Sequence, residues 1–264
     1  MKYRSLVKYV CALLSISAPA SAQLAALQFS ADRVPVGQVL HYVKSALDGT
    51  NSAEISVYVD APGRVEALKW ERGGAQATLV VATLDWSRFS VRGFESWLLA
   101  RDAPPERKAT LEVAGDTLSM SLMREPLKIA HWPWHSYDFD FTSLNLTLPH
   151  MRDPGSAFTL WRTDFVYEDP PRVAELGEVR LEFAGYEWRA GKRTRRYTIG
   201  GAGLAGRSGT WWADADSGLL IEYEIPLGDE PGYDDVRLRL GGMEKMTPAQ
   251  WEVFKRRSVA APGR

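Results

Sequence analysis

Residues 209–226 read GTWWADADSGLLIEYEIP, two apolar-rich runs that alternate with a period of two and are separated by a turn. This pattern is typical of a β-hairpin, and Gly218 suits the left-handed position of a three-residue loop at 216–218. The register then pairs Trp211 with Tyr223, Ala213 with Ile221, and Ala215 with Leu219. The opposite face is expected to be mostly solvated and carries Trp212, Asp214, Glu222 and Glu224, with Leu220 as an aliphatic exception. The inward face therefore belongs to a core or to a ligand cavity.

A second hairpin is predicted at residues 109–122, ATLEVAGDTLSMSL, with its turn at Gly115 and Asp116. Glycine at the first loop position suits a type II′ turn, and this register pairs Val113 with Leu118. Further strands are predicted at 37–45, 54–60, 64–71, 76–84, 88–101, 157–167, 193–199 and 234–240. Strands do not alternate with helices along the chain, so the pattern indicates an all-β fold rather than a parallel α/β fold.

Two of the predicted strands change phase part-way along their length. Residues 137–148 (YDFDFTSLNLTL) keep their apolar side chains on one face only if the strand bulges near 142–143, and residues 179–188 show the same slip at Gly185. Bulges bend sheets, so we expect a strongly curved antiparallel sheet, a half-barrel or barrel-like structure. A short C-terminal helix is also predicted, because Thr247 and Gln250 form a capping box around Pro248.

The N-terminal segment is typical of a secretory signal peptide. Three basic residues precede a short apolar run, and an Ala-Ser-Ala sequence follows, which predicts a signal peptide at 1–22 and a periplasmic location. Removing those three leaves 29 of the 32 basic residues against 33 acidic ones, a balance that argues against a nucleic-acid partner. The one cysteine, Cys11, lies inside this segment. The remaining chain has no apolar stretch of membrane-spanning length, and we expect one large β domain over 23–257, a soft boundary near 124–136, and a disordered tail at 258–264.

The sequence predicts no metal site, no cofactor and no catalytic residue. His131 and His135 lie about 13 Å apart on an extended chain, too far to share one ion, and His41 and His150 would join them only through the fold. The acidic loop at 229–235 lacks the regular spacing of a calcium motif. Nucleophile-elbow, zinc-protease and phosphate-loop motifs are absent. Two carboxylate pairs, Asp138 with Asp140 and Glu222 with Glu224, are expected on solvated faces rather than beside a glycosidic bond.

A basic cluster spans a predicted hairpin near Ala190 and Gly191. In that hairpin Arg193 and Arg195 share one face with Tyr186 and Trp188, an arrangement that suits binding of a phosphate, a carboxylate or an anionic glycan. The alternative is a solvated hairpin whose arginines lie over aromatic rings.

Residues 199–240 contain GRSGTWW at 206–212 and DSGLLIEY at 216–223. This W-x-D-x-x-x-G-L hairpin resembles the closing strands of secreted bacterial half-barrel proteins, whose architecture is similar to that of periplasmic lipoprotein-carrier proteins. The resemblance implies a curved antiparallel sheet whose concave side holds acyl chains under a helix.

The resulting hypothesis is a non-enzymatic exported protein that binds a lipid-like or amphipathic ligand, or a lipidated partner, in an apolar concavity. The side chains expected to line that concavity are Trp161, Phe165, Trp211, Ile221 and Tyr223. One alternative is an envelope hydrolase of glycans, which requires two carboxyl groups in a cleft beside exposed tryptophans. Another is a structural or assembly protein of the envelope, which requires an exposed apolar patch or a free sheet edge for an envelope protein partner.

Overall fold

The computed structural model describes residues 24–121, 123, 125–136, 142–166, 172–225 and 235–260. Its strands belong to a single sheet of fifteen, so the predicted all-β fold class is confirmed. The first eight are β1 (Gln38–Ala46), β2 (Ala53–Ala61), β3 (Arg64–Trp70), β4 (Gln76–Asp85), β5 (Ser90–Ala100), β6 (Ala103–Ala114), β7 (Thr117–Met120) and β8 (Leu127–Lys128). The others are β9 (Trp134–Ser136), β10 (Phe158–Val166), β11 (Arg172–Arg189), β12 (Lys192–Gly200), β13 (Ser208–Asp214), β14 (Leu220–Ile225) and β15 (Val236–Lys245).

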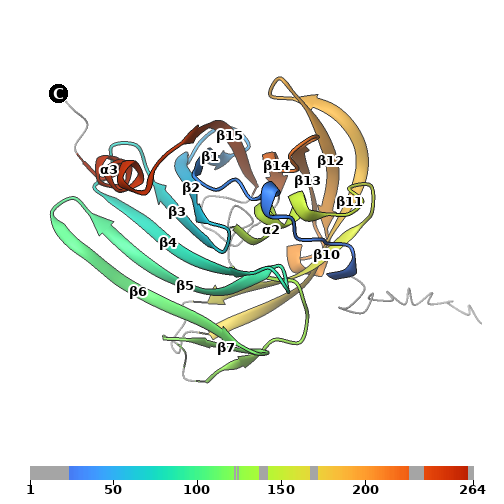
Figure 1. Cartoon of the computed structure of the whole chain (residues 1–264), viewed down its shortest axis with the longest axis horizontal. Helices are drawn as coiled ribbons and strands as arrows, with labels where there is room; N and C mark the ends of the chain where they lie inside the picture. Colours follow the sequence, from blue (N-terminus) through green and yellow to red (C-terminus); the bar gives the residue numbers. More distant parts are fainter. Residues whose placement is uncertain are drawn as a thin grey trace, which may run out of the picture.

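The first and last strands of the chain pair with each other in the middle of this sheet. From β1 the strands continue to β8 in chain order, and from β15 they run back to β9 on the other side. All neighbours are antiparallel except β9 and β10, which are parallel. The sheet is curled but not closed (Figure 1). Its two ends, β8 and β9, are joined by residues 129–133, so the chain crosses from one end of the sheet to the other near the predicted soft boundary.

Local pattern and turn chemistry explain both hairpins. In the hairpin of β6 and β7, Val113 pairs with Leu118 as predicted, and Gly115 has φ +64° at the turn. In the hairpin of β13 and β14, Trp211 pairs with Tyr223 as predicted and Gly218 has φ +77°. The next predicted pair is wrong: a bulge after Trp212 places Ala213 opposite Leu220 rather than Ile221.

The bulge predicted at Gly185 is also present. The pairing of β11 with β12 shifts between Phe183 and Gly185, and Gly185 has φ +120°. Because of this shift Tyr186 pairs with Arg195 and Trp188 pairs with Arg193, which puts all four side chains on one face of the hairpin.

The strand predicted at 137–148 is wrong over its described part. Residues 137–141 lie outside the described residues, and the next six form a helix, α2 (Thr142–Thr147), which continues into the 3-10 turn η2 (Leu148–His150). The alternation of Leu144, Leu146 and Leu148 suggested a half-buried strand. All three leucines are at most 2% exposed, because this helix is surrounded by protein on every side and needs no polar face.

The two faces of the sheet bury two separate clusters. One face, here called the inner face, carries the large cluster, to which Val57 and Ala67 belong together with the leucines of α2. The neighbouring residues Tyr58 and Leu68 point to the opposite, outer face, where they pack against Trp251. Trp251 belongs to α3 (Pro248–Ser258), which starts with the predicted capping box of Thr247 and Gln250.

The predicted C-terminal helix is therefore present and packs on the outer face of the sheet, and the helix on the inner face is α2 (Figure 1). Val259, assigned to the tail from the sequence, is 7% exposed and belongs to the outer cluster. Residues 261–264 and the predicted signal peptide lie outside the described residues. The assignment of 23–257 to one domain stays a prediction.

Candidate functional site

The space enclosed by the curled sheet is occupied by α2 and η2, here called the plug (residues 142–150). Every side chain from Leu144 to His150 is buried, including the polar side chains of Asn145 and Thr147, which are 1% and 3% exposed. The concavity expected from the sequence is thus filled by the protein's own chain in this structure.

Asn145 joins the plug to the sheet through a closed set of hydrogen bonds. Its side-chain Nδ2 donates to the Tyr42 hydroxyl at 2.9 Å, and its Oδ1 accepts from the backbone N–H of Leu220 at 3.0 Å. The Tyr42 hydroxyl donates to the carbonyl of Leu220 at 3.1 Å. The buried amide is therefore satisfied by groups of β1 and β14, two strands far apart in the sequence. The period-two pattern put Asn145 on the face opposite to Leu144 and Leu146, so alternation gave no sign that its side chain is buried.

The N-terminal segment covers the plug on another side. Leu27 forms an isolated bridge with Met151, the N–H of Gln28 donates to the carbonyl of His150 at 2.8 Å, and Arg33 Nη1 donates to the carbonyl of Pro149 at 2.7 Å. The plug thus lies between the inner face and residues 24–36, as the ribbon in Figure 1 also shows.

His150, at the end of the plug, is enclosed by aromatic rings. The ring centroids of Phe29, Trp86 and Phe89 lie 5.2, 5.0 and 5.7 Å from that of His150. Its Nδ1 accepts a hydrogen bond from the backbone N–H of Ser30 at 3.3 Å. Burial, together with the nearby positive charge of Arg33, lowers the pKa of His150 from 6.5 to about 4. His150 is therefore a neutral acceptor at neutral pH.

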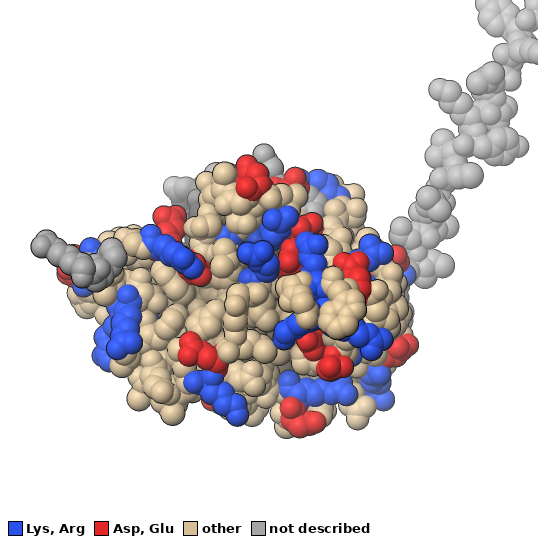
Figure 2. All heavy atoms as spheres, turned by 90° about the horizontal axis from the view of Figure 1, so that it is seen from above, with Lys and Arg blue, Asp and Glu red and all other residues tan. Residues whose placement is uncertain are grey.

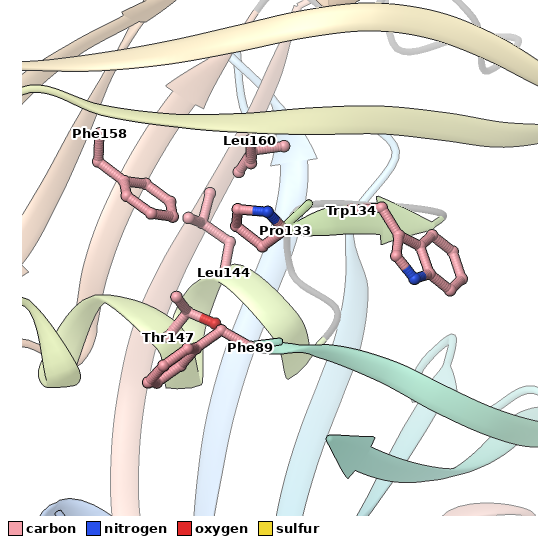
Figure 3. A pocket seen from close by; sticks show the side chains of 7 residues that line it. All are labelled: Phe89, Pro133, Trp134, Leu144, Thr147, Phe158 and Leu160. Atoms are coloured by element: carbon pink, nitrogen blue, oxygen red, sulfur yellow. The ribbon is translucent and has the colours of Figure 1, made fainter. Parts of the chain in front are cut away.

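A small cavity of about 10 Å³ remains beside the plug. This is about the space of one water molecule. Figure 3 shows Phe158, Leu160 and Pro133 on one side of it and Leu144 and Thr147 of α2 on the other; Phe89 and Trp134 complete its lining. The lining is almost entirely apolar. An acyl chain does not fit in this cavity while the plug is in place.

Most of the residues expected to line a ligand cavity lie around this packed interior. Trp211 and Tyr223 are 0% exposed and belong to the inner cluster, in which their rings stack at 5.6 Å. Ile221 is 2% exposed but belongs to neither cluster, because the bulge after Trp212 puts Leu220 on the inner face in its place. Trp161 is partly buried against the inner cluster and stacks on His131 at 3.8 Å. Phe165 lies near the end of β10, pairing there with Val173, and its side chain is not among those described. Their role in binding stays a prediction.

Buried indole N–H groups occur in this apolar interior. Trp134 and Trp211 are 1% and 0% exposed, and no group in the described part of the chain accepts a hydrogen bond from the Nε1 of either. Because buried donors normally have an acceptor, these positions leave hydrogen-bonding capacity for a water or a ligand oxygen. The inward position of Trp211 follows from alternation, whereas the burial of Trp134 and the unmet donors of both tryptophans are visible only in the structure.

The β11–β12 hairpin extends the inner face beyond the packed interior. Tyr197 is 1% exposed and lies 5.8 Å from the ring of Phe183, which in turn lies 5.2 Å from Tyr186. The row ends in solvent, where Tyr186 is 54% and Trp188 is 75% exposed. An aromatic surface therefore leads from the tip of the hairpin to the inner cluster.

The two arginines predicted to bind anions lie beside this aromatic row. The Arg193 guanidinium lies 4.4 Å above the Tyr186 ring. Arg195 Nη2 donates to the carbonyl of Ala215, while its buried Nε has no acceptor among the described residues. No described carboxylate is ion-paired with either arginine, and their role in anion binding stays a prediction.

The opposite face of the same strands is less solvated than expected. Trp212 and Glu222 are only 6% and 4% exposed, because Arg189 lies over the Trp212 ring at 4.3 Å and pairs with Glu222 at 2.6 Å. Glu224 pairs with Arg189 at 3.0 Å and with Arg237 at 2.8 Å. The predicted solvation of this carboxylate pair is therefore wrong for Glu222. Asp138, Asp140 and most of the acidic loop at 229–235 lie outside the described residues.

A wider groove lies on the outer face, between α3 and strands β4 to β6, with a volume of about 680 Å³. Apolar residues of the sheet, including Leu79, Trp97 and Leu99, line it together with charged residues of α3. At its edge Lys255 pairs with Glu66 at 2.7 Å. Burial favours the neutral form of Glu66, yet the hydrogen bonds from Lys255 and Trp251 hold the pKa of Glu66 below its usual value.

Among the described residues, no three histidine, cysteine, aspartate or glutamate side chains gather as a metal site would require. None of the described helices is long and apolar enough to cross a membrane.

No family model and no curated protein matches the chain. Solved structures resemble it weakly. A DUF1329 family protein from Desulfovibrio piger has 10% identity and a TM-score of 0.30, over 88% of this chain and 95% of the other. A putative outer membrane lipoprotein-sorting protein domain from Vibrio parahaemolyticus has 12% identity and a TM-score of 0.22, over 90% and 100%. A LolA superfamily protein from Nitrosomonas europaea has 9% identity and a TM-score of 0.20, over 89% and 97%. The weak resemblance predicted from the sequence therefore recurs here, and no site residue is carried over from it.

Proposed function

We propose that this protein is a non-enzymatic binding protein of the cell envelope. In this proposal a lipid-like or amphipathic ligand, or the acyl group of a lipidated partner, binds the inner face of the sheet where the plug now lies. The carrying observation is that a continuous apolar interior is filled by a short helix that one asparagine side chain joins to the sheet.

A ligand can displace α2 at low cost. A helix of six residues has little stability of its own, so α2 depends on its contacts with the sheet. Where its side chains are described, from Leu144 onward, the leucines make apolar contacts and Asn145 supplies hydrogen bonds to the sheet. An acyl chain offers the inner face the same kind of contact, so exchanging the plug for a ligand replaces one apolar surface by another.

The polar groups of the interior and its rim suit an amphipathic ligand. The Nε1 atoms of Trp134 and Trp211 are buried donors in need of an acceptor, and an ester carbonyl is one. Arg193 and Arg195 place positive charge at the exposed end of the same face, next to Tyr186. The expected ligand is therefore an acyl chain with a polar or anionic head group.

The glycan-hydrolase alternative has less support from the described residues. Of its two candidate carboxylate pairs, Glu222 and Glu224 are both ion-paired with Arg189. One arginine thus holds both carboxylates, whereas a glycosidase needs two carboxyl groups free to flank a glycosidic bond.

The first test is native mass spectrometry of protein purified without detergent, followed by organic extraction. We expect a discrete added mass that extraction releases as lipid. A bare protein mass, together with no saturable binding of the fluorescent probe N-phenyl-1-naphthylamine, would contradict the proposal.

A matched pair of variants tests the role of the plug. Tyr42→Phe removes the hydroxyl that accepts from Asn145, so the plug is held less firmly and the probe should bind about fivefold more tightly. Tyr58→Phe is the control, because Tyr58 is equally buried but lies on the outer face against Trp251. Equal probe affinity of the two variants would show that plug displacement does not limit binding.

A further inference from the structure

The tip of the β11–β12 hairpin exposes more aromatic surface than any other described part of the protein. Trp188 and Tyr186 are 75% and 54% exposed, whereas the next large hydrophobic side chains, Val36 and Met243, are each 45% exposed. The hairpin projects at the upper right of Figure 1, beyond the neighbouring strands. A large indole held in solvent by a projecting hairpin is an unfavourable arrangement unless something covers it.

Positive charge at the tip is divided between the two faces of the hairpin. Arg189 pairs with Glu222 and Glu224, and Arg196 pairs with Glu187 at 3.4 Å. Figure 2, which views the molecule from above, shows blue and red side chains interspersed over the visible face. Arg193 differs, because within the described chain no carboxylate lies within 4.0 Å of it and its guanidinium lies over Tyr186.

Aromatic rings and unneutralised cations therefore share one face of a projecting tip. Tryptophan and tyrosine place an apolar ring and a polar N–H or O–H at the boundary between hydrocarbon and water, which is why they gather at membrane interfaces. Arginine beside them reaches the phosphate groups of lipids while its methylene stem stays in apolar surroundings. A protruding hairpin can insert such side chains into a lipid surface without a groove on either partner.

From this arrangement we propose that the hairpin tip, Tyr186–Arg193, is a docking site for an anionic lipid bilayer surface. Trp188 and Tyr186 enter the interfacial layer, and Arg193 binds lipid phosphate. The site goes beyond ligand binding in the interior and does not depend on it. If both hold, the aromatic row from Tyr186 to Tyr197 lies between the bilayer and the inner face.

Co-sedimentation with vesicles tests the proposal. The protein is mixed with vesicles of phosphatidylcholine alone, or of equal parts phosphatidylcholine and phosphatidylglycerol, and the bound fraction is measured at low and high salt. We expect binding to the mixed vesicles, weak binding to phosphatidylcholine alone, and loss of binding at high salt.

Two variants and two matched controls assign the binding to the hairpin. Arg193→Gln should weaken partitioning about fivefold, the effect of about one basic residue near an anionic surface. Trp188→Ala should also weaken partitioning, because it removes the indole that enters the interfacial layer. Met243→Ala removes an exposed apolar side chain on β15, and Arg92→Gln removes an exposed charge on β5, so both controls should bind like the unchanged protein. All four positions lie at the surface, and circular dichroism verifies that the fold is kept.

Three results would overturn the proposal. They are no binding to mixed vesicles, equal binding of the hairpin variants and their controls, and hairpin-dependent binding to insoluble peptidoglycan in place of vesicles. The probe measurements on Tyr42→Phe are unaffected by any of these results, so failure of membrane docking is distinguishable from failure of ligand binding.

Discussion

His150 is a buried histidine whose environment favours its neutral form. Its ring packs among Phe29, Trp86 and Phe89, and its Nδ1 accepts from the backbone of Ser30. Protonation would place an unpaired charge in this aromatic site and would remove the acceptor. The lowered pKa of His150, about 4, is the direct consequence.

The free energy of unfolding should therefore fall as the pH falls from about 6.5 to about 4. In that range the unfolded chain binds a proton at His150 and the native protein does not, so acid favours the unfolded state. The full difference in pKa corresponds to about 3 kcal/mol. Urea unfolding at several pH values measures it. His150→Gln should flatten the curve between pH 5 and 6.5, above the range where carboxylates titrate, and an unchanged slope would contradict this assignment.

Gly209 shows how closely two strands approach. A Cβ at this position would lie 2.3 Å from the carbonyl oxygen of Glu224 and 2.9 Å from the Cα of Ile225, both backbone atoms that cannot swing away. Gly209→Ala should therefore lower the free energy of unfolding by about 3 kcal/mol, at the upper end of overpacking effects. Gly242→Ala is the control, since nothing lies within 4 Å of the added carbon. Urea unfolding measures the stability of both variants. Equal stabilities would contradict the prediction, because they would mean that β13 and β14 move apart at little cost to admit the methyl group.

At the scale of elements, the hairpins were predictable because residues close together in the sequence determine their turns and pairing. Alternation and a glycine at the turn give the register of β6 with β7 and the first pair of β13 with β14. Even the bulge at Gly185 leaves a phase change in the sequence. Where the prediction failed, distant residues decide the outcome.

The plug is the clearest of these failures. Leucines two residues apart favoured a strand. The plug is instead enclosed by β1, β14 and the N-terminal segment, so it has no solvent-facing side and its sequence lacks the polar stripe of an amphipathic helix. Likewise Trp212 and Glu222 are buried by Arg189, whose position is set by a different hairpin. The apolar inner face was predictable from alternation, whereas the segment that fills it was not.

α3 is attached to the sheet through a buried ion pair. Lys255 and Glu66 are 7% and 6% exposed, and Glu66 also accepts from Trp251 Nε1 at 2.7 Å. Lys255→Met removes one cationic partner of Glu66 and leaves Arg64, whose Nη2 lies 3.1 Å from Glu66 Oε1, so the free energy of unfolding should fall by about 1.5–3 kcal/mol.

The double variant Lys255→Met with Glu66→Gln separates the charge from the packing. A neutral glutamine can still accept from Trp251, so most of the lost stability should return in urea unfolding. If the double variant were as unstable as Lys255→Met, the loss would come from packing of the lysine stem rather than from the charge of a carboxylate that has lost Lys255.

At the scale of the whole molecule, the pairing of β1 with β15 ties the two ends of the chain together at the centre of the sheet. Strands on both sides of this centre contribute to the same inner cluster, for example Val65 of β3 and Val179 of β11, each 0% exposed. The cluster also includes the plug, which no single half of the sheet encloses. Each half thus needs the other to bury its inner face.

The chain should accordingly unfold as one cooperative unit in spite of its size. Val65→Ala and Val179→Ala each leave a small cavity in the shared cluster, which should cost about 2 kcal/mol. Because the two positions lie in opposite halves, both substitutions should move one single calorimetric peak to lower temperature, with equal van't Hoff and calorimetric enthalpies. Two domains would behave differently, since each substitution would then shift one of two transitions and leave the other in place. The same experiment therefore decides whether residues 23–257 form one domain, as the continuous sheet and its shared interior lead us to expect.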